Sequence, residues 1–309
     1  MKTATLVYLV TGASSGLGLA TARLLLSKGA FVAALDLREP EEGAFDGVAA
    51  LSREETEGRE TINASSAFTV GAPTGPPTIK KDGEKEEKRW AYFECDVGDE
   101  ESVKNAVRRV QEQWKGRKWG GVVHCGGVGM AGKTVSNDGT PFNFDTFQAV
   151  HRINLLGSFL IASHVASVLA KQYLASLPSS ASSGKAPPQA EEDQGVIILT
   201  SSVSATEGQM GQVAYSSSKA GVEGLVLPMA RDLGRYGIRV VCLAPSLFAT
   251  SMGKNTSDKV RASLLATTLF PPRFGVADEF AQLAVQVVEN GYLNGGVIRI
   301  DGGGRMAKM

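Results

Sequence analysis

The sequence predicts an α/β protein whose core is one parallel β-sheet with helices on both faces. Two observations lead to this prediction. Seven short, mostly apolar segments recur along the chain, and helical patterns separate most of them. Strands without polar alternation are typical of parallel sheets, because helices cover both faces of such sheets. A chain of 309 residues, 43% of them hydrophobic, is long enough to bury this core.

The expected elements follow one another in an alternating order. Strands are expected at residues 5–10, 31–36, 90–95, 121–125, 196–200, 239–244 and 297–300. Helices are expected at 17–28, 100–114, 146–174, 215–236 and 278–290. Gly29 suits the C-terminal end of the first helix, and Asp99 suits the N-cap of the second. The first strand, helix and strand thus form a βαβ unit.

Two segments interrupt this alternation. Residues 39–89 are rich in Gly, Pro, Ser and charge, and residues 176–194 are rich in Ser, Pro and Ala. Such compositions are typical of surface insertions rather than core elements. We therefore expect a single domain over residues 1–309 that carries two insertions.

Composition argues against several classes of function. The chain has 32 basic residues (Lys and Arg) and 32 acidic residues (Asp and Glu), so its formal net charge is zero. This balance indicates neither a nucleic-acid nor an anionic membrane partner. Cys95, Cys125 and Cys242 form no CxxC pair, and the three histidines form no ligand motif, so we expect no metal and a reducing compartment. No apolar run predicts a membrane span or a secretory signal.

The last three residues carry a possible address. Ala307-Lys308-Met309 has the small-basic-apolar form of the SKL-type peroxisomal signal. The alternative is a chance tripeptide on a cytoplasmic or mitochondrial protein. We expect a peroxisomal location.

A glycine-rich turn lies between the first strand and the first helix. It reads Thr-Gly-Ala-Ser-Ser-Gly-Leu-Gly from Thr11 to Gly18. The pyrophosphate of a dinucleotide binds at such a turn, because the backbone can approach it closely and the helix N-terminus offers N–H groups. The sequence therefore predicts a Rossmann-type cofactor site. Its predicted turn contacts are Gly12, Ser15, Gly16, Leu17 and Gly18.

An acidic residue predicts the identity of the cofactor. Asp36 ends the second strand, 18 residues beyond Gly18. A carboxylate at this place can accept hydrogen bonds from the ribose hydroxyls of NAD and would repel the 2′-phosphate of NADP. Arg38 could bind that phosphate, but Asp36 is better placed. The prediction is NAD.

A tyrosine and a lysine predict proton transfer. Tyr215 and Lys219 lie four residues apart and share one face of the expected helix. A nearby ammonium stabilises a tyrosine phenolate, which favours general acid–base chemistry near neutral pH. Ser202 follows the strand at 196–200, at the carboxyl edge where parallel sheets bind ligands.

In four features the sequence resembles the short-chain dehydrogenase/reductase family. In chain order, they are the Gly turn, the acidic strand end, the serine and the Tyr-Lys pair. The resemblance implies hydride transfer between a substrate carbon and a nicotinamide. It implies that Tyr215 exchanges the hydroxyl proton, that Ser202 binds the substrate oxygen, and that Lys219 assists Tyr215 and binds the nicotinamide ribose. Asn154 matches the asparagine that holds a proton-relay water, although a buried asparagine can also be a purely structural amide. Further implied cofactor contacts are Asp96, Val97, Cys125, Gly127, Phe248 and Thr250.

Four segments are also similar to type 2 3-hydroxyacyl-CoA dehydrogenases. They are residues 207–212, 227–233, 244–250 and 293–302. The similarity implies a homotetramer that oxidises 3-hydroxyacyl-CoA with NAD, in β-oxidation of fatty acids or in branched-chain catabolism. The alternatives are a dehydrogenase of a steroid, polyketide or other secondary metabolite, and a non-enzymatic NAD-binding scaffold, which would not need all four catalytic residues.

Two motifs depart from the family pattern. The usual Asn-Asn-Ala-Gly turn is His124-Cys125-Gly126-Gly127, and Ser246 replaces the usual glycine after Pro245. Both departures touch the cofactor rim and neither removes a proton-transfer group. The cations Lys254, Lys259, Arg261 and Arg273 are candidates to meet CoA phosphates.

Overall fold

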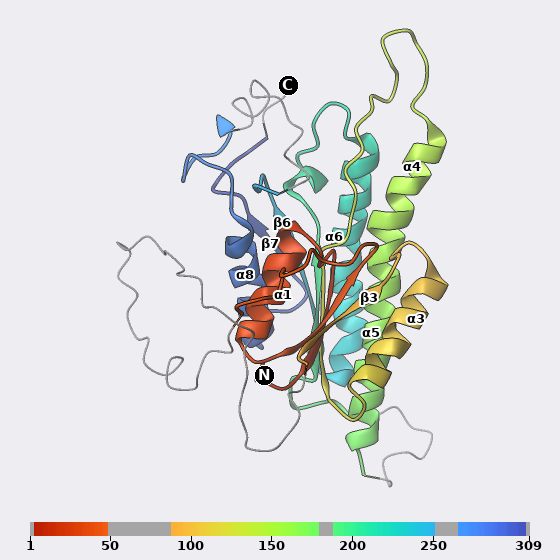
Figure 1. The fold of residues 1–309 in the computed structure, drawn as a ribbon. Helices are drawn as coiled ribbons and strands as arrows, with labels where there is room; N and C mark the ends of the chain where they lie inside the picture. The colour runs from red at the N-terminus through yellow and green to blue at the C-terminus, as the bar shows by residue number, and fades with distance from the viewer. Residues whose placement is uncertain (1–2, 49–87, 179–187, 251–264, 307–309) are drawn as a thin grey trace.

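Seven parallel strands form the centre of the computed structural model (Figure 1). The structure describes residues 3–48, 88–178, 188–250 and 265–306. The strands are β1 (Val7–Thr11), β2 (Phe31–Asp36), β3 (Trp90–Glu94), β4 (Trp119–His124), β5 (Gly195–Thr200), β6 (Ile238–Pro245) and β7 (Val297–Ile300). Their order in the sheet is β3-β2-β1-β4-β5-β6-β7. The predicted Rossmann-type sheet is confirmed. The strand order reverses between β1 and β4, which is where sheets of this kind bind ligands.

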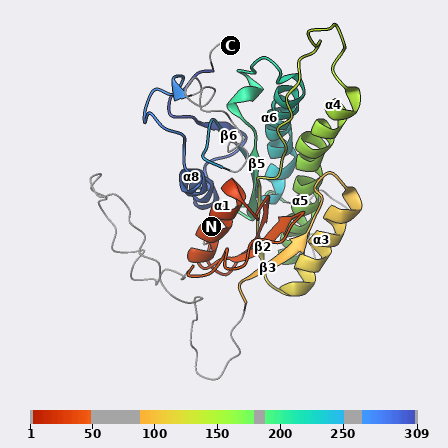
Figure 2. The ribbon, with the colours of Figure 1, turned by 45° about the horizontal axis from the view of Figure 1, so that its top comes forward.

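Helices cover the sheet on both faces, as Figures 1 and 2 show. On one face lie α1 (Gly16–Ser27) and α8 (Ala277–Glu289), which contact each other. The other face carries α3 (Glu100–Gln113), α4 (Phe144–His151), α5 (Gly157–Ser176) and α6 (Val213–Leu233). The molecule therefore has three layers, with the sheet between two layers of helices.

Strand β1 shows why a strand at the centre of the sheet is apolar on both faces. Val7 and Leu9 belong to the core beneath α3, α5 and α6, whereas Tyr8 and Val10 belong to the core beneath α1 and α8. All four side chains are fully buried. A strand at the centre of a sheet covered on both faces has no solvent side on which a polar residue would be favoured.

The helix expected at residues 146–174 is longer and contains an irregular turn. Helix α4 continues into a π-helical segment, Arg152–Leu156, and then into α5. A π turn adds one residue to the helical repeat and is often found at functional sites. By length and composition alone Phe144–Ser176 could cross a membrane, but half of its most apolar stretch is buried against the protein. This burial is what a core helix shows.

The described ends of both insertions contact the core. Phe45 is buried and its ring lies 4.5 Å from that of Trp90. At the second insertion, the N–H groups of Ala190 and Gln194 donate to the carbonyls of Arg235 and Gly237. The intervening residues 49–87 and 179–187 lie outside the described residues.

A buried arginine fastens α8 to the sheet. The guanidinium of Arg239, on β6, donates to the carbonyls of Val287, Val288 and Leu293 at 2.9–3.0 Å. It also forms an ion pair with Asp193 at 3.0 Å. The cation therefore satisfies carbonyl groups at the C-terminal end of α8 that lack partners within the helix.

Candidate active site

The predicted catalytic side chains come from three segments of the chain. Ser202 follows β5, Asn154 lies in the π-helical segment, and Tyr215 and Lys219 lie in the first two turns of α6. Helices α4 and α6 contact each other. The structure thus assembles residues that are more than 60 positions apart in the sequence.

The lysine is held in a defined place. Lys219 is buried, and its Nζ atom donates to the Thr200 carbonyl at 2.9 Å. The same Nζ lies 5.8 Å from the centre of the Tyr215 ring. A β-carbon built on Gly127 would lie 3.4 Å from this Nζ, so the loop after β4 passes close to the ammonium. Lys219 therefore lies between Tyr215, the end of β5 and the loop after β4.

Asn154 links that loop to α6. Its Oδ1 accepts from the Val128 N–H at 2.8 Å, and its Nδ2 lies 2.9 Å from the Val128 carbonyl and 3.0 Å from the Ser218 hydroxyl. The side chain is fully buried. It therefore performs the structural role of a buried amide, while the proton-relay role remains a prediction.

Two neighbouring serines have different environments. The Ser201 hydroxyl lies 2.9 Å from the Glu223 carboxylate and 3.1 Å from the Lys219 carbonyl, so it joins β5 to α6. The Ser202 hydroxyl accepts from the Ser204 N–H at 3.1 Å, in the short turn after β5. Ser202 thus lies at the carboxyl edge of the sheet, where the sequence predicts it.

The glycine turn has the shape that a dinucleotide requires. Gly12 has φ +64°, and a β-carbon there would lie 3.0 Å from the Cys125 carbonyl carbon. A β-carbon on Gly18 would lie 2.2 Å from the Gly12 oxygen, so only glycine allows α1 to approach β1 this closely. The first turn of α1 has no acidic residue and Ser15 makes no side-chain cap, which leaves the N–H groups of this helix end available to a phosphate. The turn therefore fits the cofactor that the sequence predicts.

Asp36 points back toward this turn. One carboxylate oxygen accepts from the Ser14 N–H at 3.0 Å and the other from the Leu37 N–H at 2.8 Å. The Ser14 hydroxyl donates to the Arg38 carbonyl. Each carboxylate oxygen retains a lone pair for a ribose hydroxyl.

The remaining predicted cofactor residues lie on the loops after β3, β4 and β6. Asp96 accepts from the Gly98 N–H at 2.8 Å, and Val97 is buried beside it. Burial raises the pKa of the Cys125 thiol to about 12, so it stays protonated. Thr250 carries a methyl group 3.3 Å from the position of a β-carbon on Gly16, which brings the loop after β6 over the start of α1. The ring of Phe248 packs edge-on against Phe280.

One buried histidine has a role that the sequence analysis missed. His124, at the end of β4, lies with its Nδ1 2.7 Å from the Thr11 hydroxyl, and that hydroxyl accepts from the Gly126 N–H at 3.1 Å. Burial, helped by the charge of Lys219, lowers the pKa of His124 to about 3, so the ring is neutral. The available signal was the departure from asparagine at this position. The histidine preserves a side-chain link between β1 and the loop after β4.

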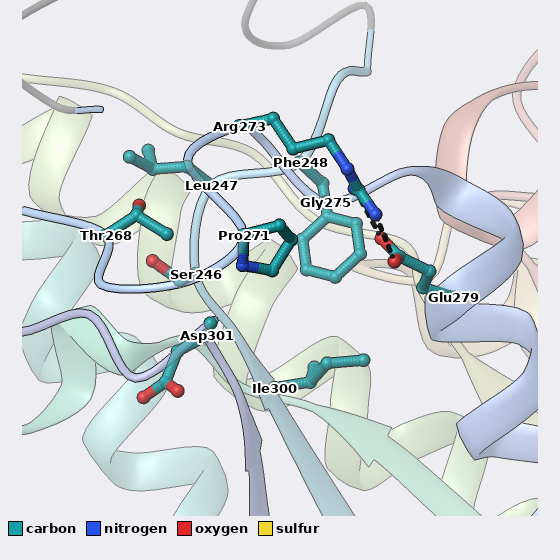
Figure 3. Close-up of a pocket in the computed structure, with 11 residues that line it drawn as sticks. Ser246, Leu247, Phe248, Thr268, Pro271, Arg273, Gly275, Glu279, Ile300 and Asp301 are labelled. Carbon is teal, nitrogen blue, oxygen red and sulfur yellow. Dashed lines mark hydrogen bonds and ion pairs between the residues drawn. The ribbon is translucent and has the colours of Figure 1, made fainter. Parts of the chain in front are cut away.

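A cavity of about 140 Å³ lies beyond the ends of β6 and β7 (Figure 3). Ser246 and Arg273 are among its lining residues. Arg273 forms a bidentate ion pair with Glu279, with N–O distances of 2.7 and 3.0 Å. Arg273 is therefore paired with a carboxylate, and its contact with a CoA phosphate stays a prediction. The candidates Lys254, Lys259 and Arg261 lie outside the described residues.

A second, more open hollow of about 400 Å³ lies at the start of α6. Its lining includes residues 208–213 and 133–135 together with Ser216. In the part of the chain that the structure describes, the Gln209 Nε2 and the Ser216 hydroxyl are buried without a hydrogen-bond partner. Buried polar atoms without partners carry a cost, which a polar ligand would relieve. Across the described residues no group of three or more His, Cys, Asp or Glu side chains could hold a metal ion.

Comparisons with known proteins agree with this geometry. A family model described as short chain dehydrogenase matches residues 68–261. The chain belongs to the short-chain dehydrogenase family. The 3-hydroxyacyl-CoA dehydrogenase type-2 of Bos taurus is 36% identical, over 97% of this chain and 95% of the bovine protein. The (3R)-3-hydroxyacyl-CoA dehydrogenase of Mus musculus is 32% identical, over 96% of this chain and 94% of the mouse protein.

A solved short-chain dehydrogenase structure extends the comparison to the fold. The crystal structure of 3-hydroxyacyl-CoA dehydrogenase type-2 from Mycobacterium avium has a TM-score of 0.74 and 29% identity, and covers 99% of this chain and 98% of that one. The predicted family is thereby confirmed. As a member of it, this chain is an oxidoreductase, and members of the family use nicotinamide dinucleotides.

Proposed function

We propose that this protein is an NAD-dependent 3-hydroxyacyl-CoA dehydrogenase. The observation that carries the proposal is the 36% identity, over almost the whole chain, to a protein named as such. The grouping of Ser202, Tyr215 and Lys219 at one edge of the sheet supports it. The substrate is a 3-hydroxyacyl thioester of coenzyme A and the product is the 3-ketoacyl thioester.

The chain's own residues would supply the proton chemistry. Ser202 would donate a hydrogen bond to the substrate oxygen and orient it toward Tyr215. The phenolate oxygen of Tyr215 would take the hydroxyl proton, and the Lys219 ammonium would stabilise that phenolate electrostatically. NAD bound at the glycine turn would supply the hydride acceptor that the oxidation of the alcohol requires.

The preference for NAD rests on Asp36. Its two carboxylate oxygens are oriented by the N–H groups of Ser14 and Leu37. A fixed carboxylate at the end of β2 favours the free ribose hydroxyls of NAD and repels a 2′-phosphate. Arg38, two residues on, would have to overcome this repulsion for NADP to bind well.

The open hollow at the start of α6, lined by Ser216 and residues 208–213, is the proposed place for the acyl group. Its lining combines the exposed apolar side chains of Val135 and Met210 with the buried polar atoms of Gln209 and Ser216. An acyl thioester offers both an apolar chain and a carbonyl oxygen. The mixed lining therefore suits this class of substrate.

We also propose a homotetramer in peroxisomes. Large apolar side chains are exposed along α4, α5 and the π segment between them, with Phe144 67%, Leu156 54% and Phe159 48% accessible. Patches of this kind mark protein–protein contacts.

The motivation for the location is the tripeptide Ala307-Lys308-Met309. Sedimentation of the purified protein tests the first proposal, and localisation with and without the tripeptide tests the second.

The decisive experiment is a substrate screen. Both enantiomers of 3-hydroxybutyryl-CoA, and longer and branched homologues, are offered with NAD or NADP while the absorbance of the reduced cofactor is followed. We expect turnover of CoA esters with NAD, and turnover about 10²–10⁴-fold slower in the Tyr215→Phe variant. Oxidation of steroid or other secondary alcohols without turnover of any CoA ester would contradict the proposal.

A further inference from the structure

The segment after the last strand touches two loops at the active-site edge. We call residues 301–306 the C-terminal turn. On one side it contacts the loop at residues 206–212, which lies between Ser202 and Tyr215. On the other side it contacts residues 267–270. The C-terminal turn thus bridges two parts of the chain that are about 60 residues apart.

A network of four charged side chains makes the first contact. Glu207 pairs with Arg299 at 2.9 Å and with Arg305 at 3.6 Å, and its other oxygen accepts from the Met306 N–H at 3.0 Å. Asp301 pairs with Arg299 at 2.8 Å and with Arg305 at 3.1 Å. Two carboxylates and two guanidinium groups therefore hold the C-terminal turn against the loop that precedes Tyr215.

Backbone hydrogen bonds make the second contact. The Gly302 carbonyl accepts from the N–H groups of Leu269 and Phe270 at 3.2 and 3.0 Å, and the Arg305 N–H donates to the Thr267 carbonyl at 3.3 Å. The C-terminal turn is therefore joined to the loop at 206–212 through Glu207 and to residues 267–270 through its backbone.

Glu207 is the central member of the network. Its side chain is 21% exposed, against 12% for Asp301 and 65% for Arg305. Burial alone would raise the pKa of Glu207, but the Met306 N–H and the two arginines hold it below its ordinary value. Ion pairs that are partly buried and make several hydrogen bonds stabilise a folded protein more than exposed pairs do. Arg305, the most exposed of these three residues, therefore stabilises the network least.

We propose that Glu207 is a positioning residue for proton transfer, acting with Arg299 and Asp301. Glu207 lies five residues after Ser202 and eight before Tyr215, on the loop that joins them. By fixing this loop to the C-terminal turn, Glu207 sets the position of the Ser202 hydroxyl relative to the Tyr215 oxygen. Small misplacements of reacting groups cost large factors in rate, of about 100-fold for 1 Å.

The test compares Glu207→Ala, Glu207→Gln, Arg299→Ala and the double variant Glu207→Ala/Arg299→Ala. Glutamine keeps an acceptor for the Met306 N–H but loses the charge. We expect Glu207→Ala to lower kcat by roughly tenfold or more, with Glu207→Gln between it and the unaltered protein. The KM for NAD should change less than about twofold, because the loop at 206–212 includes none of the predicted cofactor contacts. The loss in the double variant should be smaller than the sum of the two single losses, because both single variants break the Glu207–Arg299 pair.

The matched control is the exposed pair Arg108–Glu112 on α3, with an N–O distance of 2.7 Å. Glu112→Ala should leave kcat and KM unchanged. Thermal unfolding of every variant verifies that the compared proteins are folded. An unaltered kcat in Glu207→Ala, or strictly additive effects in the double variant, would overturn the proposal.

The kinetic test rests on the proposed function, because it needs a substrate that turns over. Amide hydrogen exchange provides a readout that does not. In Glu207→Ala the amides of Met306, Leu269 and Phe270 should exchange roughly tenfold faster, while those of β5 keep their rates. If the unaltered protein oxidises no CoA ester, the proposed function is wrong. Hydrogen exchange would still show whether Glu207 holds the C-terminal turn in place. Unchanged exchange at these three amides would sink the positioning role even if CoA esters are oxidised.

Discussion

The ammonium of Lys219 donates a hydrogen bond to the carbonyl of Thr200 at 2.9 Å, and this bond fastens α6 to the end of β5. The same bond fixes the charge beside Tyr215, with Nζ 5.8 Å from the ring centre. Lys219 therefore both anchors α6 to β5 and places a positive charge beside Tyr215. For this reason, replacing Lys219 and replacing Tyr215 should have different effects.

The Tyr215→Phe variant removes only the phenol oxygen. We expect turnover to fall by about 10²–10⁴-fold, because general acid–base catalysis of this kind is lost. The affinity for NAD, measured by fluorescence titration, should stay within about twofold of its original value, since the glycine turn and Asp36 are intact. In Lys219→Met both turnover and NAD affinity should fall, because the ammonium also faces the loop after β4. Equal losses of NAD affinity in both variants would contradict this division of roles.

Removal of the Asp36 carboxylate should relax the choice of cofactor. In Asp36→Ala the N–H groups of Ser14 and Leu37 lose their acceptor and the repulsion of a 2′-phosphate disappears. The ratio of kcat/KM for NADP to that for NAD should rise by about tenfold or more, because hydrogen bonds to a charged group are lost on the NAD side. The exposed Asp46→Ala is the control and should leave the ratio unchanged. A ratio that stays constant in Asp36→Ala would show that another residue selects the cofactor.

His124 should make the fold sensitive to mild acid. Burial lowers the pKa of its ring to about 3, below the unfolded value of about 6.5, so the folded state takes up a proton less readily than the unfolded chain. Its contribution to stability is complete above the unfolded pKa and is lost as pH falls toward the folded one. Between pH 7 and pH 5 this single group should cost about 2 kcal/mol of unfolding free energy.

The His124→Asn variant isolates that effect. Asparagine can still hydrogen-bond the Thr11 hydroxyl but does not titrate. Urea unfolding at both pH values should show a smaller loss of stability in the variant, by about the same 2 kcal/mol. Equal pH dependence in the two proteins would mean that His124 is not kept neutral by the fold.

The buried Arg239 should be costly to remove. Arg239→Met leaves Asp193 without its cation and three carbonyl groups without their donor. We expect the unfolding free energy to fall by about 3–5 kcal/mol, as for other broken buried ion pairs. The exposed Arg108→Ala, which also loses an ion pair, should change it by less than about 1 kcal/mol. A similar small effect at Arg239 would contradict its role as the fastening of α8.

Sequence patterns predicted the strands well because these segments are mostly apolar and most of them end next to glycine or an acidic residue. Strands β2 and β7 lie at the expected residues, and β4 begins two residues earlier, at Trp119. The Asp99 N-cap is confirmed by its bond from the Ser102 N–H at 2.7 Å. The π turn around Asn154 could not be predicted, because one extra residue in a helix barely changes the apolar spacing.

The charged partners were beyond sequence reasoning for a different reason. The pairing of Arg273 with Glu279 and of Glu207 with Arg299 depends on loops that meet only in the folded protein. The distinct environments of Ser201 and Ser202 depend on which of them faces Glu223, and this too is a tertiary contact.

The place of β1 at the centre of the sheet has a consequence for synthesis on the ribosome. β1 is made first, yet its ladder on one side requires β4, whose residues emerge more than a hundred positions later. Until then the nascent chain holds an apolar strand with an unsatisfied edge, and pairings of such large sequence separation are slow to form. We therefore expect the nascent chain to need chaperones most while its amino-terminal half is being synthesised, before β4 can pair with β1.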